Sequence, residues 1–213
     1  RKTSVLFAAL ILLYIISVLL RLGYLELEGE EPRRAVISLE MLQSGNFIRP
    51  THLGWDYYNK PVLFNWVLCG IMYLSGSSSE FVLRLPSVFF YLLWAFCHYR
   101  VSKVFFSRGI ALLSAFFMLT CADIYFYGLG NGAELDIFYS FIVYLQAISI
   151  YYFFHQKKCN WLFLSSYFFC AIGFLTKGFP SVLFQVLTFA WLCFYAKSLR
   201  ILVRKEHLWG LMI

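Results

Sequence analysis

The chain has 213 residues, of which 61% are hydrophobic and 14% charged, and it carries a net charge of +7. A soluble globular domain averages about 45–50% apolar and about 25% charged residues, so this composition excludes that class and indicates a polytopic membrane protein. The basic residues form short clusters between apolar runs, a pattern that sets membrane topology and argues against nucleic-acid binding.

Apolar runs long enough to cross a membrane, for which about 17–25 residues are needed, recur along the chain. They lie at about 5–22, 82–99, 109–127, 135–154, 161–176 and 179–196. The first is not followed by a small-residue cleavage site, so we expect a transmembrane helix and not a signal peptide. HLWGLMI, at the end of the chain, reads as the opening of another apolar segment. We therefore interpret the chain as the N-terminal part of a longer protein.

A shorter apolar run at 62–74 decides the predicted orientation. If this run lies at the membrane interface without crossing, the basic clusters at 1–2, 100–108, 157–158 and 197–205 all fall on one side, as the positive-inside rule requires. If it crosses, the first cluster is separated from the rest. We therefore expect an interfacial helix at 62–74, and an outer loop at 23–61 on the non-cytoplasmic face.

The outer loop itself is predicted to contain a helix. In EPRRAVISLEML, Pro32 suits the first helical position and Gly45 suits the stop that follows. The apolar positions Ala35, Leu39 and Leu42 share one face. The next stretch, NFIRPTHLGWDYYNKP, predicts an ordered, irregular path back to the membrane.

Charged residues gather at the predicted outer face. Glu30 and Glu31 begin the loop helix, Lys60 precedes the interfacial run, Asp136 starts the fourth span and Lys177 ends the fifth. Singly, the acids are explained as caps of a solvated helix and the lysines as side chains that reach for lipid headgroups. An acid beside an apolar span is costly unless it is paired or faces water. Together, the charges suggest a site for an anionic, lipid-borne substrate.

Five segments in order resemble the bacterial ArnT/PMT-like glycosyltransferases, the GT-C membrane enzymes that include lipid A aminoarabinose transferases and protein O-mannosyltransferases. These segments are EEPRRAVISLEMLQSGNFIRP, GWDYYNKPVLFNW, FVLRLPSVFF, ELDIFYSF and AIGFLTKGFP. The resemblance implies an all-α polytopic GT-C-like transmembrane helix bundle, with a long outer first loop that contains juxtamembrane helices. It also implies transfer of a sugar from a polyprenyl-phosphate donor to a lipid, glycan or protein acceptor at the periplasmic face of the bacterial inner membrane.

The resemblance implies roles for particular residues. Glu30, Asp136 and Glu31 match the catalytic acids, and the choice between Glu30 and Glu31 as principal acid stays open. The family's cations at the donor phosphate fall on Arg33, Lys60 and Lys177. Tyr57 and Tyr58 are expected to line the substrate, with an interfacial aromatic belt as the alternative.

Two departures from the family pattern stand out. Glu30 replaces the usual Asp, and Asn59 stands where some lipid A transferases have a metal-associated Glu. We therefore expect no cofactor, and a divalent metal stays an open alternative. The rival function is a transporter or flippase of a lipid-linked anion, although such proteins usually place their sites near the bilayer midplane.

Overall fold

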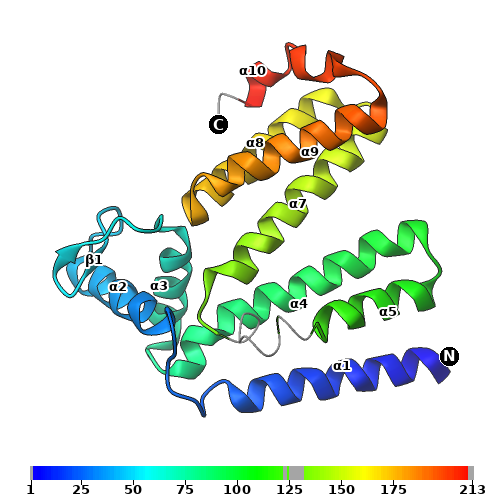
Figure 1. The fold of residues 1–213 in the computed structure, drawn as a ribbon. Coiled ribbons are helices and arrows are strands. Elements are labelled where there is room, and N and C mark those ends of the chain that lie inside the picture. Colours follow the sequence, from blue (N-terminus) through cyan, green and yellow to red (C-terminus); the bar gives the residue numbers. More distant parts are fainter. Residues whose placement is uncertain (1, 122–123, 125–131, 211–213) are drawn as a thin grey trace. The chain divides into compact units, whose positions relative to one another are not determined.

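The computed structural model describes residues 2–121, 124 and 132–210, most of them helical (Figure 1). The chain divides into two compact units. The first unit combines residues 1–57 with residues 65–138, and the second combines residues 58–64 with residues 139–213.

The first unit contains three long apolar helices, α1 (Lys2–Arg21), α4 (Glu80–Phe105) and α5 (Arg108–Leu119). Helix α5 packs against both of the others (Figure 1). Tyr91 and Ala95 of α4 form a buried cluster with Leu119 and Ile137. This cluster holds the end of α5 and the start of the next long helix against α4.

Helix α5 covers the first part of the span predicted at 109–127, and Ile124 is helical as well. Helix α5 has 12 residues and ends at Leu119, and Thr120 and Cys121 lie outside it. The expected continuation at 122–123 and 125–127 lies outside the described residues. In the sequence, Thr120 gives little indication that a helix ends, because differences in intrinsic helix propensity are small and tertiary contacts often override them.

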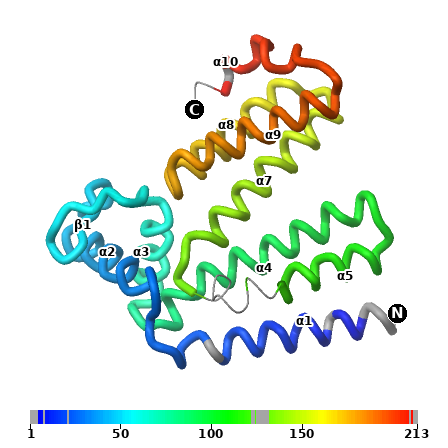
Figure 2. The backbone as a smooth tube through the Cα atoms, viewed as in Figure 1, coloured from blue at the N-terminus to red at the C-terminus, as the bar shows by residue number. Residues whose placement is uncertain are grey.

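The outer-loop helix forms as α2 (Glu31–Ser44), with Pro32 in its first turn. Gly45 ends it in the left-handed conformation, with φ of 69°, and its amide donates to the carbonyl of Met41. A glycine at this position avoids the steric cost that a Cβ would bring. The next helix, α3 (Leu63–Ser75), corresponds to the interfacial run expected at 62–74, and α2 and α3 lie side by side (Figure 2).

A small hairpin connects α2 to α3, where an irregular path was expected. Strands β1 (Thr51–His52) and β2 (Trp55–Asp56) pair antiparallel around Leu53 and Gly54, both of which have positive φ. An Arg49–Asp56 ion pair of 2.5 Å closes the hairpin. Strands of two residues are too short for an alternating pattern to reveal them.

The buried face of α2 is partly polar. Its buried residues include Ala35 and Ile37 but also Arg34 and Ser38, whereas Leu39 and Leu42 are only partly buried. The physical reason is polar packing: the buried side-chain amide of Asn65 on α3 donates to the Ser38 hydroxyl at 3.1 Å and to the Arg34 carbonyl at 3.3 Å. Hydrogen bonds therefore orient this helix, and hydrophobic periodicity alone does not detect them.

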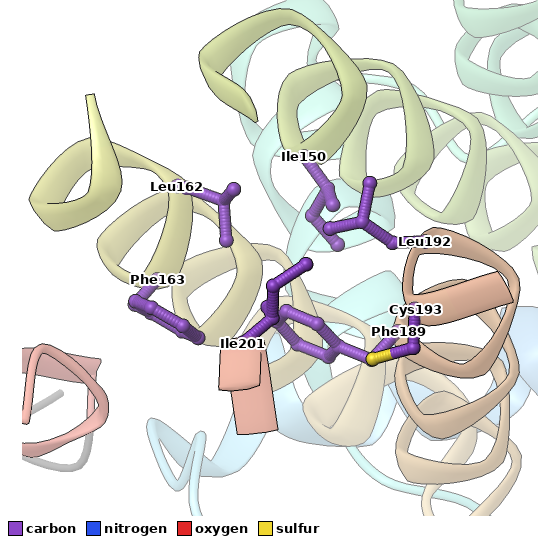
Figure 3. Packing of buried hydrophobic residues seen from close by; sticks show 7 residues of the cluster. All are labelled: Ile150, Leu162, Phe163, Phe189, Leu192, Cys193 and Ile201. Carbon is purple, nitrogen blue, oxygen red and sulfur yellow. The ribbon is translucent and has the colours of Figure 1, made fainter. Parts of the chain in front are cut away.

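The second unit contains most of α7 (Leu135–His155), whose first turn belongs to the first unit, with α8 (Cys159–Lys177) and α9 (Pro180–Ala196). A short 3₁₀-helix, η1 (Leu199–Val203), and α10 (His207–Gly210) follow. Helices α7, α8 and α9 share a buried core with η1, drawn in Figure 3 and made of Ile150, Leu162, Phe163, Phe189, Leu192, Cys193 and Ile201.

Among the described residues, α4, α7 and α8 are long and apolar enough to cross a membrane, by length and composition. Shorter apolar stretches lie in α1, α3, α5 and α9. Large apolar side chains such as Leu20, Phe117 and Phe194 are more than 60% exposed, which suits a lipid environment better than water. The protein is thus an all-α membrane protein, and the topology predicted for each span stays a prediction.

Candidate active site

Glu31, the first residue of α2, forms a buried ion pair with Arg84 of α4. The guanidinium donates from Nε to Oε1 at 2.9 Å and from Nη2 to Oε2 at 2.8 Å, in the fork geometry that arginine makes with carboxylates. Both side chains are only 6% exposed. The pair joins two helices that are 53 residues apart in the sequence.

Arg84 also holds the segment between α1 and α2. Its Nη1 donates to the carbonyls of Leu22 and Leu25 at 2.7 and 2.8 Å, and its Nη2 donates to the carbonyl of Glu26 at 2.8 Å. The guanidinium therefore satisfies the orphan carbonyls that follow the end of α1, in addition to the Glu31 carboxylate. One side chain thereby determines the path of the chain into α2.

The Glu31 carboxylate accepts two further hydrogen bonds, from the backbone amides of Glu28 at 2.9 Å and Ala133 at 2.6 Å. Burial raises the pKa of this carboxyl, but the hydrogen bonds from Arg84 and the two amides outweigh burial and hold the pKa below its ordinary value. The Glu31 carboxylate is thus engaged by four hydrogen bonds. A carboxylate surrounded by donors is a poor base, which favours Glu30 as the principal acid, and the catalytic role expected of Glu31 stays a prediction.

Glu30 lies in a different environment. Its carboxylate accepts from Nη1 of Arg33 at 2.9 and 2.7 Å, and the two side chains are 45% and 40% exposed. Of the adjacent acids, Glu30 is therefore the one that a substrate can reach. Arg33, assigned by resemblance to the donor phosphate, is equally accessible and sits directly beside this acid.

A second ion pair, between Arg34 and Glu134, ties α2 to the segment before α7. Nε of Arg34 lies 3.3 Å from the Glu134 carboxylate, and the two side chains are 6% and 18% exposed. The hydroxyl of Ser87 on α4 donates to the Glu134 backbone carbonyl at 3.2 Å. These contacts hold the start of α7, and with it Asp136, near the N-terminal end of α2.

The acids of this region influence one another. Burial raises the pKa of the Glu134 carboxyl, Arg34 opposes that rise, and repulsion from Asp136 and Glu30 adds to it. Asp136 and Glu30 therefore each lie close enough to Glu134 to act on its charge. The first unit thus gathers Glu30 and Asp136, two of the expected catalytic acids, with Glu134 as a third acid.

The remaining expected residues are divided between the two units. Tyr57 belongs to the first unit, where it is half-buried and its ring lies 6.3 Å from that of His52. The second unit contains Lys60, Lys177 and Tyr58, which is 72% exposed. Lys177 is the last residue of α8. That the acids and these lysines serve one reaction stays a prediction.

The described residues do not fit a carboxylate-bound metal. They contain no group of three or more His, Cys, Asp or Glu side chains that could hold an ion, and position 59 carries an amide in place of the carboxylate expected of a metal ligand. No catalytic step is therefore assigned to a metal.

Comparison with known families decides the class. A family model described as dolichyl-phosphate-mannose-protein mannosyltransferase matches residues 59–213. The chain belongs to this family. The description of this family is that of a transferase and not of a transporter or flippase.

Curated relatives of this mannosyltransferase-family chain agree on one activity. The chain is 35% identical over 162 residues to the undecaprenyl phosphate-α-4-amino-4-deoxy-L-arabinose arabinosyl transferase of Erwinia tasmaniensis, covering 71% of the chain and 28% of the relative. A transferase of the same description from Proteus mirabilis is 32% identical over 204 residues, covering 88% and 34%. The chain thus spans about a third of the length of these relatives.

Solved structures establish the fold of this family member. ArnT from Cupriavidus metallidurans matches in its apo state with a TM-score of 0.72, and bound to undecaprenyl phosphate with a TM-score of 0.77. In both, 20% of residues are identical and 98% of this chain is covered, with 40% and 38% of the ArnT chain. The expected GT-C-like helix bundle is thereby confirmed.

Three residues of this region were missed as site residues by sequence reasoning: Arg84, Arg34 and Glu134. Arg84 offered a usable signal, because an arginine inside the apolar run FVLRLPSVFF must find a buried partner. Arg34 and Glu134 lie in mixed-charge or glycine-rich sequence, where a charged residue is unremarkable. Their pairing over 100 positions becomes visible only in the fold.

Proposed function

We propose that the protein transfers a sugar from a polyprenyl-phosphate-linked donor to a lipid, glycan or protein acceptor, at the periplasmic face of a bacterial inner membrane. The proposal rests chiefly on membership of the mannosyltransferase family, since the match covers most of the chain. The named activity of the relatives favours undecaprenyl phosphate as carrier, 4-amino-4-deoxy-L-arabinose as sugar and a lipid A acceptor.

The different environments of the two adjacent acids support Glu30 as the base. In the proposed reaction, the acceptor hydroxyl oxygen attacks the anomeric carbon while Glu30 takes the hydroxyl proton. A positioned general base contributes about 10²–10⁴-fold to the rate. Asp136, whose negative charge is felt by the neighbouring Glu134, is the proposed orienter or partner.

The proposed cations act at the leaving group. As the bond from the anomeric carbon to the phosphate oxygen breaks, its electron pair stays on the polyprenyl phosphate, which leaves with added negative charge. Arg33, Lys60 and Lys177 are the side chains proposed to stabilise this charge, and exclusion of water would strengthen their effect. The exposed guanidinium beside Glu30 supports the role given to Arg33.

The test uses the full-length protein, reconstituted with labelled undecaprenyl-phosphate aminoarabinose and lipid A. We expect Glu30→Gln to reduce transfer by about 10²–10⁴-fold, and Asp136→Asn and Lys177→Ala to reduce it strongly. Glu28→Gln is the matched control, because Glu28 is an exposed acid whose backbone, and not its carboxylate, engages Glu31. Near-normal transfer in all three test variants would contradict the roles assigned to these residues. Movement of intact donor across the bilayer without transfer of the sugar would favour a flippase.

A further inference from the structure

The ammonium group of Lys177 lies over an aromatic ring inside the second unit. Its Nζ is 5.3 Å from the centroid of the Tyr139 ring, within the distance at which a cation is attracted to the negative face of an aromatic ring. Tyr139 projects from the second turn of α7 and is 4% exposed. The mobile end of Lys177 therefore lies against a buried and well-packed surface.

The packing around Tyr139 shows why its ring is held in place. Gly173 lies one helical turn before Lys177, on the same face of α8. A Cβ at Gly173 would lie 2.7 Å from the Ser181 hydroxyl oxygen and 3.5 Å from Cε2 of Tyr139. The absence of a side chain thus lets α8 and α9 approach closely, next to the ring of Tyr139.

Residues of α9 complete the support. Ser181, which is 1% exposed, donates a long hydrogen bond of 3.5 Å to the Tyr139 hydroxyl. The Phe184 ring meets the Tyr139 ring in an edge-on arrangement, with centroids 6.2 Å apart. The tyrosine is thereby contacted by both neighbouring helices, and its position is determined before any ligand binds.

We propose that Tyr139 is a positioning residue that holds Lys177 ready for a lipid-linked phosphate. This inference rests on the proposed function, in which Lys177 binds the donor phosphate. A lysine at a helix end near the interface otherwise extends towards headgroups on its flexible stem. Attraction to the ring keeps the ammonium in one place, so less side-chain freedom is lost when the phosphate arrives.

The ring and the hydroxyl of Tyr139 have separable effects. Tyr139→Phe keeps the ring face and removes only the long hydrogen bond from Ser181, so it is expected to bind phosphate almost normally. Tyr139→Leu removes the ring. The attraction between a cation and an aromatic ring is weak when the contact is exposed to water and stronger when it is buried. We therefore expect Tyr139→Leu to weaken phosphate-dependent binding by roughly threefold to thirtyfold.

The experiment compares the binding of two probes, undecaprenyl phosphate and uncharged undecaprenol, to the purified full-length protein. A general loosening of the helices would weaken both probes alike, whereas misplacement of Lys177 would reduce only the preference for the phosphate. The matched control is Phe163→Leu, which removes another buried ring of α8 that stacks on Phe189, with centroids 5.7 Å apart. It is expected to lower stability without changing that preference.

A second set of variants covers the case in which Tyr139→Leu does not fold. Incorporation of increasingly fluorinated phenylalanines at position 139 keeps the ring shape and weakens its negative face, and the phosphate preference should fall in step with fluorination. A preference that is unchanged by fluorination and by Tyr139→Leu overturns the positioning role.

The Lys177→Ala variant separates this inference from the function on which it rests. If Lys177→Ala loses the phosphate preference while the Tyr139 variants keep it, the positioning role alone is wrong. If Lys177→Ala keeps the preference, the phosphate-binding role of Lys177 fails, and the inference fails with it.

Discussion

Arg84 of α4 and Glu31 of α2 form an enclosed two-point ion pair, and the same guanidinium also holds three carbonyls that follow α1. Removal of one partner of a buried pair leaves an uncompensated charge, at a cost of about 3–5 kcal/mol. We expect Arg84→Met and Glu31→Gln each to destabilise the protein by about this amount, measured by chemical unfolding in detergent.

A double-mutant cycle provides the control for that prediction. Since replacement of both partners removes the uncompensated charge, Arg84→Met combined with Glu31→Gln should cost less than the sum of the same two single changes. Simple additivity would contradict the pairing. Arg49→Met is the matched surface control, because Arg49 and Asp56 are 63% and 37% exposed and such pairs contribute about 0–1 kcal/mol.

The lowered pKa of Glu31 predicts a loss of stability in acid. A carboxyl with a depressed pKa in the folded state adds stability that is complete above its ordinary pKa of 4.5 and is lost as the pH falls through the folded value. The free energy of unfolding of the wild type should therefore decline below about pH 4.5. Glu31→Gln should show a shallower decline, and identical slopes for the two proteins would argue against the assignment.

The raised pKa of Glu134 predicts the opposite dependence of stability on pH. Because the pKa of the Glu134 carboxyl is raised, the folded protein binds the carboxyl proton more tightly than the unfolded chain does. The protonated carboxyl therefore adds to the free energy of unfolding below pH 4.5, and this contribution is lost as the pH rises through the folded pKa. Glu134→Gln cannot titrate, so it should gain stability relative to the wild type as the pH rises from 4.5 towards neutrality. A stability difference that stays constant over this range would refute the prediction.

Gly173 predicts a size limit at the contact between α8 and α9. Because an added Cβ would meet the Ser181 hydroxyl at 2.7 Å, Gly173→Ala should cost about 1–3 kcal/mol in thermal or chemical unfolding. Ser181→Ala in the same protein should recover part of this cost. Gly70→Ala, in α3 with open space around its Cβ, should be neutral or stabilising, and equal effects at the two glycines would contradict the packing described.

Local sequence alone predicted the class of the protein and several boundaries of its elements. Long apolar runs predict helices because a backbone in lipid must satisfy its own hydrogen bonds, and helices occupy most of the ranges expected to span. Pro32 and Gly45 delimit α2 through backbone geometry that acts over one or two residues. The family resemblance rested likewise on short motifs in order, and the family match confirms it.

The burial and the hydrogen-bond partners of the charged residues were decided by the tertiary structure. Glu30 and Glu31 are identical side chains at adjacent positions, yet one reaches solvent and the other is enclosed by Arg84 and the amide of Ala133. No local pattern distinguishes them, because two of the partners that enclose Glu31 lie 53 and 102 positions away in the chain. The role of a carboxylate depends on burial and on the donors that surround it, and both quantities exist only once distant segments have packed together.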